Sequence, residues 1–275
     1  MIDLHTHTTA SDGRRTPADL VAYAAAAGVT VLSVTDHDTV AACHPASAAA
    51  AAQGVEFVPG IEITAIRDEV DVHVLGYFID VRSSALLDFL GDQRRRRLDR
   101  VRQMVVRLAQ HGIALDADAI VQPGIDDPST SAGRPWIARA LVAGGHVATS
   151  DEAFDRWLER GQPAFVAREA ATPEEVIARI HDAGGVASLA HPGLLGRDEW
   201  IPALVNAGLD AVEAHHGEHD AAQTARYLEL AKRLELAVSG GSDYHADESH
   251  GAARPGSTSL PREAYEKLKA MRKSA

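Results

Sequence analysis

The sequence is short of cysteine, of positive charge and of long apolar runs, and each shortage excludes a class of protein. Its one cysteine, Cys43, excludes an intramolecular disulfide and a cysteine-rich zinc site. No apolar run approaches the roughly 20 residues that span a membrane, and Asp3 and His5 stand where a signal peptide would carry basic and then apolar residues. We therefore expect a cytoplasmic protein that does not bind membranes.

The charge balance and two missing signatures narrow the chemistry further. A formal net charge of −12 argues against a surface for long nucleic acid, because contacts with many phosphates need clustered positive charge. The sequence has neither a G-x-S-x-G elbow nor a Walker loop, so serine nucleophiles and ATP-driven chemistry are not expected. An anionic substrate would need locally supplied cations, and metal ions can supply them.

Apolar runs of strand length alternate with helical patterns in two parts of the chain. Among the 275 residues, these runs are 29–35, 55–58, 70–78, 186–190, 209–214 and 236–239. Strands separated by helices favour a parallel β/α arrangement, and barrels of about 200–250 residues commonly form one domain. The pattern predicts an α/β barrel interrupted by an insert.

The insert is predicted to be helical, because residues 83–168 show helical periodicity and no strand pattern. We assign 1–82 and 169–275 to the barrel and 83–168 to an inserted helical cap subdomain over its mouth. The arginine run 94–97 is either a solvated helix face or a contributor to anion binding. Residues 122–133 are expected to form a polar linker.

The N-terminal stretch LHTHTTASDG carries the first candidate site. His5 and His7 are two residues apart in a strand pattern, so both imidazoles point to one face. Paired histidines on one face suit a divalent metal better than a core, where each ring nitrogen needs a partner. Asp12 follows in a Ser-Asp-Gly turn and offers a carboxylate oxygen.

Other residues able to bind metals lie in, or just beyond, later strands. In 70–78 the alternation turns His73 away from the face that holds Val72 and Val74. Parallel β/α barrels build their sites where the carboxyl ends of the strands meet, so we expect these side chains to converge there. Singly, each has an ordinary structural explanation; together they favour a metal site. The candidates are His5, His7, Asp12, His37, Glu62, His73, His191, Asp243 and His245.

The motifs HTH, SDG, TDHDT, PGIEIT, HVLGYF, AHPG and GSDYH, in this order, resemble those of the polymerase and histidinol phosphatase (PHP) family of metal-dependent phosphoesterases. The resemblance covers almost the whole chain and implies a distorted (β/α)7 barrel with two or three divalent metal ions. It assigns His5, His7, Glu62 and Asp243 to a first metal, Glu62, His73 and His191 to a second, and Asp12, His37 and His245 to a third. Imidazole and carboxylate ligands without thiolate suit manganese, iron or zinc, and we expect manganese.

Within the family, GRPWIARAL and AGGVASLAHPG resemble a branch that contains nucleoside 3′,5′-bisphosphate phosphatases and a related 5′→3′ exoribonuclease. The branch implies that Arg134 contacts a substrate phosphate, although Trp136 stands where a histidine is expected. His216 and His219 match substrate-binding positions, or they are solvent-exposed loop residues. The leaving alcohol would receive its proton from His216 or from a metal-bound water.

The resemblance implies an enzyme that hydrolyses a phosphate monoester of a small nucleotide, favouring the 3′-phosphate of nucleoside 3′,5′-bisphosphates. The nucleophile would be a hydroxide bridging two metals, since shared metals lower the pKa of water. The residues expected at the reacting atoms are His37, Asp243, His245 and His216. Cleavage of short oligoribonucleotides or of cyclic nucleotides uses the same chemistry, and a non-catalytic module braced by metals is the third alternative. The sequence does not indicate an oligomeric state.

Overall fold

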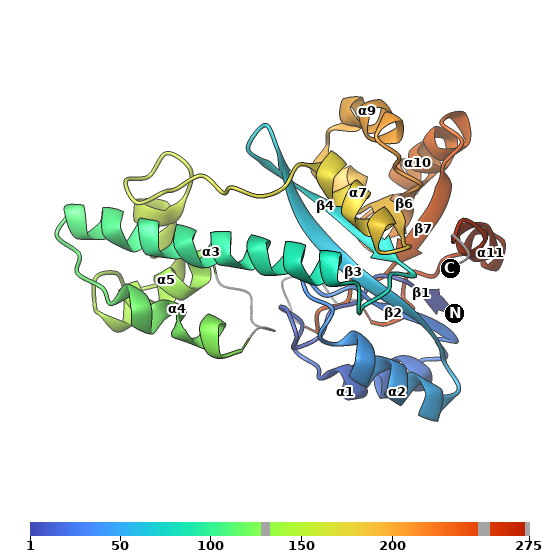
Figure 1. Ribbon diagram of the computed structural model, residues 1–275, viewed down its shortest axis with the longest axis horizontal. Helices are drawn as coiled ribbons and strands as arrows, with labels where there is room; N and C mark the ends of the chain where they lie inside the picture. Colours follow the sequence, from blue (N-terminus) through green and yellow to red (C-terminus); the bar gives the residue numbers. More distant parts are fainter. Residues whose placement is uncertain (128–132, 247–253, 273–275) are drawn as a thin grey trace. The chain divides into compact units, whose positions relative to one another are not determined.

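A computed structural model describes residues 1–127, 133–246 and 254–272. The chain divides into two compact units, which are described separately (Figure 1). The first unit combines Met1–Leu90 with Ala171–Ala275, and the second is Gly91–Ala170. Residues 128–132, within the predicted linker 122–133, lie outside the described residues.

The first unit is built on a seven-stranded sheet whose strands follow one another in chain order. The strands are β1 (Ile2–Asp3), β2 (Val31–Val34), β3 (Glu56–Arg67), β4 (Val70–Tyr77), β5 (Val186–Leu189), β6 (Ala211–His216) and β7 (Ala237–Gly241). The sheet curls back on itself: the Leu4 N–H donates to Gly240 O at 3.2 Å, and Thr6 forms a parallel bridge with Tyr244. The result is the nearly closed, distorted barrel that the motifs predict.

The direction of β4 corrects the expectation of parallel strands. β4 pairs antiparallel with both β3 and β5, while the other neighbouring strands are parallel. β3 and β4 form a hairpin whose turn residues Asp68 and Glu69 have φ values of 50° and 63°. His73 consequently reaches the site from the middle of β4, opposite Thr64, and not from a carboxyl end.

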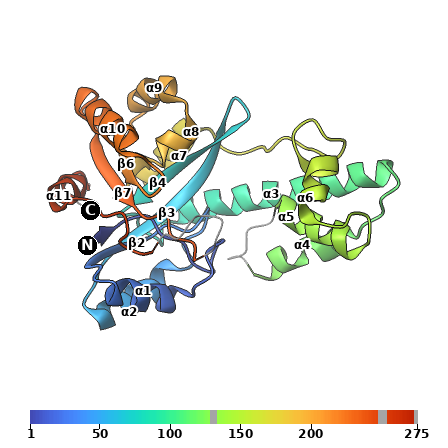
Figure 2. The ribbon, with the colours of Figure 1, turned by 180° about the vertical axis from the view of Figure 1, so that it is seen from behind.

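Helices cover the barrel on two sides (Figures 1 and 2). On one side lie α1 (Pro17–Ala26), which Thr16 caps, and α2 (Cys43–Gln53), which Gly54 ends in the left-handed conformation. On the other side lie α7, α9 and α10, and Val72 and Val74 of β4 pack into the same apolar cluster as Val176 and Ile180. The remaining bounds are α7 (Pro173–Asp182), α8 (Pro192–Leu195), η2 (Asp198–Trp200), α9 (Ile201–Asn206), α10 (Ala221–Arg233) and α11 (Arg262–Ala270).

The second unit is helical, and the boundary between the units falls within the long helix α3. Its elements are α3 (Ser84–Gln110), α4 (Ala117–Asp126), α5 (Arg134–Ala143), α6 (Ser150–Ala153) and the π-helix η1 (Phe154–Leu158). Leu108, Ile137 and Leu141 are fully buried in its core. In the part of the chain that the structure describes, no helix is long and apolar enough to cross a membrane.

Helix α4 corrects the predicted linker, whose residues 122–126 are helical. Asp116 caps the helix, and Val121 is buried in the core of the helical unit. A Cβ on Gly124 would lie 2.9 Å from Trp136 Cη2, so the missing side chain admits the indole ring. Packing therefore outweighs the helix-breaking tendency of Pro123 and Gly124.

Candidate metal centre

Hydrogen bonds to the buried carboxylate of Asp3 hold the end of β1 in place. His5 and His7 follow Asp3, whose buried carboxylate accepts hydrogen bonds from the Ser242 N–H at 2.9 Å and the Ser242 hydroxyl at 2.7 Å. Gly241 lies so close that a Cβ there would meet His5 Cβ at 2.6 Å. The chain just after β7 is thus held against the segment after β1 that carries both histidines.

Glu62, in β3, lies at the middle of the cluster with 1% of its side chain exposed. Its Oε2 lies 3.2 Å from His5 Nε2, from His7 Nε2 and from His37 Nδ1. Its Oε1 lies 2.9 Å from His73 Nδ1 and 3.1 Å from His191 Nε2. Burial alone would raise the pKa of Glu62, but the surrounding imidazoles outweigh burial and hold the pKa well below its usual value.

Asp243 is a second shared carboxylate, placed just after β7. Its Oδ1 lies 3.2 Å from His5 Nε2 and 3.1 Å from His7 Nε2, and its Oδ2 lies 3.3 Å from His216 Nε2. Its φ of 53° is unusual for a residue with a side chain. Strain of this kind persists only where surrounding contacts hold the backbone, as they commonly do at functional sites.

Asp12 forms the more exposed side of the cluster, with 49% of its side chain accessible. Its Oδ1 lies 3.3 Å from His245 Nε2, and its Oδ2 lies 3.6 Å from His37 Nε2. Burial lowers the pKa of His37 to about 3, so its imidazole is neutral at physiological pH. A neutral imidazole keeps a lone pair for a metal ion.

Several donor atoms in the cluster lack ordinary hydrogen bonds. Both ring nitrogens of His7, the Nδ1 atoms of His37, His73 and His191, and Asp243 Oδ1 are buried and make no hydrogen bond of ordinary geometry with the described residues, although carboxylate oxygens lie 2.9–3.2 Å from several of them. Unpartnered buried nitrogens are costly unless another group satisfies them. Four overlapping groups of residues offer donor atoms that lie within 4.8 Å of one another: His7, Asp12, His37 and His245; His5, His216 and Asp243; His5, His7 and Glu62; and His37, Glu62 and His73. This set of imidazole and carboxylate donors fits divalent metal ions.

Comparison with known proteins agrees with this geometry. The sequence model of the PHP domain family matches residues 3–133. A 3′,5′-nucleoside bisphosphate phosphatase from Chromobacterium violaceum is 35% identical over 255 residues, covering 91% of this chain and 89% of that protein. The chain belongs to the PHP family.

Two further PHP relatives extend the comparison. The 5′-3′ exoribonuclease Rnm from Salmonella typhimurium is 35% identical over 250 residues, covering 88% of this chain and 84% of that protein. A crystal structure of a protein assigned as a metal-dependent phosphoesterase from Bifidobacterium adolescentis superposes with a TM-score of 0.81 at 32% identity. That superposition covers 99% of this chain and 96% of the other, so the barrel and the helical unit both have counterparts in one solved structure.

His216 and His219 lie on the β6 side of the PHP centre but make different contacts. His216 is buried; its Nδ1 accepts from the Glu218 N–H at 3.1 Å, and its Nε2 faces Asp243. Burial lowers the pKa of His216, but the contact with Asp243 outweighs burial and raises it overall. His219 uses both ring nitrogens on the backbone, donating to Ala214 O at 3.1 Å and accepting from the Gly193 N–H at 3.1 Å.

Arg134 and Trp136 belong to the helical unit. Arg134 opens α5, and its guanidinium carbon lies 5.6 Å from the centre of the Phe154 ring. Trp136 is half-buried and packs against the apolar core of that unit, beside Gly124. The indole that replaces an expected histidine therefore has a packing role.

Three buried carboxylates around the PHP centre were not singled out from the sequence. Asp3 anchors the chain after β7, and Asp36 accepts from the Thr8 N–H at 2.7 Å and the Ser11 hydroxyl at 2.6 Å, which holds the loop leading to Asp12. Glu213 is the third, within the apolar strand β6. Acidic residues inside otherwise apolar runs were the available signal.

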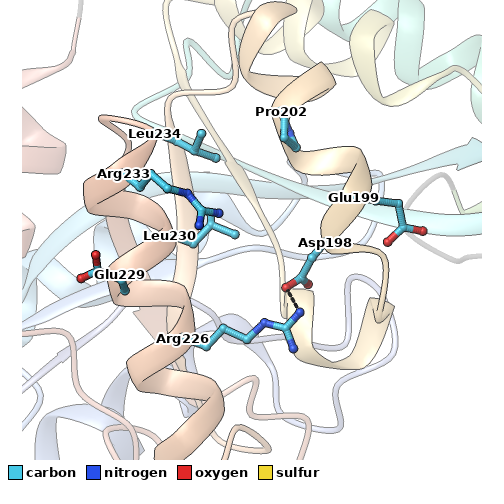
Figure 3. Close-up of a pocket in the computed structure, with 8 residues that line it drawn as sticks. All are labelled: Asp198, Glu199, Pro202, Arg226, Glu229, Leu230, Arg233 and Leu234. Atoms are coloured by element: carbon cyan, nitrogen blue, oxygen red, sulfur yellow. Dashed lines mark ion pairs between the residues drawn. The ribbon is translucent and has the colours of Figure 1, made fainter.

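A pocket of about 520 Å³ lies apart from these ligands (Figure 3). η2, α9 and α10 line it, and an ion pair between Arg226 and Asp198 crosses it. Pro202, Leu230 and Leu234 form its apolar wall. None of its lining residues is a candidate ligand, so this pocket is not the PHP centre.

Proposed function

We infer that this chain is a metal-dependent phosphoesterase, and we propose that it removes the 3′-phosphate from nucleoside 3′,5′-bisphosphates. The observation that carries the inference is Glu62, one buried carboxylate within 3.2 Å of imidazole nitrogens from β4 and from the segments that follow β1, β2 and β5. A carboxylate so surrounded is suited to bridge metal ions, and sites with closely spaced metals recur in phosphatases and nucleases.

We propose two or three divalent cations, manganese in the first place, with iron or zinc as alternatives. The first would be held by His5, His7, Glu62 and Asp243, the second by Glu62, His73 and His191, and the third by Asp12, His37 and His245. When bound, such ions supply Lewis acidity to phosphate oxygens and lower the pKa of water. The grouping is supported by the separate contacts of Glu62 Oε1 with His73 and His191.

The chain's own residues are proposed to handle charge and protons. His37, Asp243 and His245 would border the reacting phosphate, because His37 and His245 contact the partly exposed Asp12 and His245 also contacts Asp243. His216 would give the leaving 3′-oxygen its proton from Nε2, the ring nitrogen that carries a proton while Nδ1 accepts from the Glu218 N–H. His219 is proposed to contribute to substrate binding by holding the start of α8, just after His191.

The substrate assignment is supported by the Chromobacterium violaceum relative, whose name states a 3′,5′-nucleoside bisphosphate phosphatase. We propose that residues 83–168 act as a cap in which Arg134 binds the substrate's second phosphate through charge-assisted hydrogen bonds. A small phosphorylated nucleotide in the cytoplasm is the proposed partner. The Rnm relative, which is equally identical, favours a second candidate function, 5′→3′ removal of nucleotides from short RNA.

The two functions are separated by comparing substrates with one enzyme preparation. Protein stripped with a chelator and reloaded with Mn²⁺ is assayed on 3′-phosphoadenosine 5′-phosphate, a short 5′-phosphorylated RNA and a 2′,3′-cyclic nucleotide. We expect the highest kcat/KM on the bisphosphate, with the products of all three substrates separated and quantified by ion-exchange chromatography: inorganic phosphate and a nucleoside monophosphate from the bisphosphate, nucleoside monophosphates from the RNA, and the opened monoester from the cyclic nucleotide. Glu62→Gln protein is the blank for contaminating phosphatases.

Each other outcome has a definite meaning. Preference for the RNA establishes the exoribonuclease, and preference for the cyclic nucleotide establishes a phosphodiesterase. Inactivity on all three substrates with Mn²⁺ bound overturns the proposed substrates and favours a centre in which metals only brace the fold.

A further inference from the structure

Glu213 links two candidate ligands that arrive from different strands. It lies in β6 and is fully buried, and its Oε1 lies 3.0 Å from His5 Nδ1. Its other oxygen, Oε2, accepts a hydrogen bond of 2.8 Å from the His191 backbone N–H. A single carboxylate outside the candidate ligand set therefore contacts the histidine after β1 and the histidine after β5.

The contact with His5 decides which ring nitrogen is available. A neutral imidazole has one N–H; a cation held by Glu62 and Asp243 would exclude it from Nε2, and the Glu213 carboxylate would accept it from Nδ1. Nε2 then keeps its lone pair, and it faces Glu62 Oε2 and Asp243 Oδ1, each at 3.2 Å. Glu213 thus presents to the cluster the form of His5 that can bind a cation.

The contact with His191 holds an unusual backbone. His191 has φ 25° and ψ 58°, a conformation that side-chain-bearing residues rarely adopt. Glu213 accepts a hydrogen bond from the His191 N–H, and His219 Nε2 accepts one from the Gly193 N–H two residues later. With this backbone, His191 Nε2 lies 3.1 Å from Glu62 Oε1.

We propose that Glu213 is a positioning residue that sets the tautomer of His5 and the backbone of His191, so that two proposed metal positions depend on one buried carboxylate. This role rests on the proposed metal-dependent function, because the tautomer matters only where Nε2 binds a cation. Glu213 itself does not touch substrate in this proposal.

The chain contains a matched control at the other end of the same strand. Asp210 precedes β6, and its Oδ2 accepts from the Ala187 N–H at 2.8 Å and contacts His181 Nε2 at 2.7 Å. Like Glu213, this carboxylate joins one backbone N–H to one imidazole. His181 is not a candidate ligand, so Asp210 tests the structural value of such a pair without the metal centre.

The test compares Glu213→Gln with Asp210→Asn. A glutamine has one acceptor oxygen and an NH2 donor, so it can serve His5 or His191 but not both. If its oxygen takes the His191 N–H, its NH2 faces His5 Nδ1 and moves the imidazole proton to Nε2. If its oxygen instead accepts from His5 Nδ1, its NH2 group faces the backbone N–H of His191, and two donors oppose each other there.

The first readout is Mn²⁺ binding to metal-free protein, measured by calorimetry. We expect Glu213→Gln to weaken at least one binding step by about 10–100-fold, the usual effect of losing a residue that orients a ligand. Asp210→Asn is expected to lower the melting temperature and leave Mn²⁺ binding unchanged. Equal Mn²⁺ affinities for Glu213→Gln and the wild type overturn the proposal, and so does equal weakening by the two variants.

The second readout is the tautomer of His5 in protein loaded with Zn²⁺, a diamagnetic ion that keeps the NMR signals sharp, measured by ¹⁵N NMR of the imidazole nitrogens and assigned with a His5→Gln variant. The wild type should carry its proton on Nδ1, and a proton on Nε2 overturns the proposal. Should Glu213→Gln fail to fold, Glu213→Asp keeps both acceptor oxygens and is expected to retain the Nδ1 proton with intermediate Mn²⁺ affinity. Neither readout uses substrate. A wild type that is inactive on the bisphosphate would therefore refute the proposed substrate without changing the conclusion about Glu213.

Discussion

The two compact units bury different kinds of side chain. Most of the fully buried polar side chains that the structure describes lie in the barrel unit, including Asp3, His5, Glu62 and Glu213, whereas the helical unit contributes Gln93. The core of the helical unit is formed by apolar side chains. Burying charge costs free energy unless partners satisfy it, so the barrel's stability should depend on its ligand cluster and the helical unit's on packing.

The largest effect should follow removal of the shared carboxylate. We expect Glu62→Gln to lower kcat/KM by at least about 100-fold, the loss typical of one charge-stabilising group in an active site. Glu174→Gln is the control in the same unit, because Glu174 forms a partly exposed ion pair with Arg67 at 3.2 Å. Steady-state kinetics on the preferred substrate gives kcat/KM for both variants. Equal values would show that Glu62 is not part of the catalytic centre.

Packing should dominate in the helical unit. Leu141 is fully buried there, and Leu141→Ala should lower the free energy of unfolding by about 2–5 kcal/mol through lost contacts and a cavity. Val106→Ala is the control, since Val106 is 57% exposed on α3. Denaturant unfolding gives the stability and calorimetry the Mn²⁺ affinity, which should stay unchanged in both variants. A change in Mn²⁺ affinity for Leu141→Ala would show that packing in the helical unit is energetically coupled to the metal centre.

Metal removal should act on the barrel unit alone. A ligand present at 100 times its Kd stabilises the folded state by about 2.7 kcal/mol. Hydrogen exchange with and without a chelator should therefore show lost protection in β3 and β6 and constant protection in α4 and α5. Uniform loss across both units would contradict the separation.

The smallest effect should come from the proposed substrate arginine. Arg134→Ala should raise KM by about 10-fold or more, the value of one hydrogen bond to a charged group, while Mn²⁺ loading stays intact. Arg139→Ala, an exposed residue on the same helix, is the control. Unchanged kinetics for Arg134→Ala would show that Arg134 does not bind the substrate phosphate.

The sequence was informative about the barrel for a physical reason. The periodicity of apolar residues is a local signal, so the apolar runs along the chain predicted strands that the structure contains. The direction of β4 was not predictable in this way, because alternation is the same in parallel and antiparallel strands. The hairpin turn Asp68-Glu69 also lacks the usual Asn-Gly or Asp-Gly signal.

The supporting residues were harder to predict than the candidate ligands. Histidines in strand patterns stand out, whereas Glu213 becomes meaningful only when β6 lies beside the chain carrying His5. Helix α4 was missed because Pro123 and Gly124 suggest a turn locally, while the packing that sustains the helix comes from Trp136 on another helix. Tertiary contacts decided both cases.

The pairing of His5 with Asp243 has a consequence for the making of the protein. On a ribosome, β1 and His5 emerge long before Asp243 is synthesised. His5 therefore lacks this carboxylate partner while the sheet is still open. Contacts so distant along the chain form late and slowly. Hydrolytic competence should therefore appear only after synthesis of β7 is finished, and partial chains should release no phosphate.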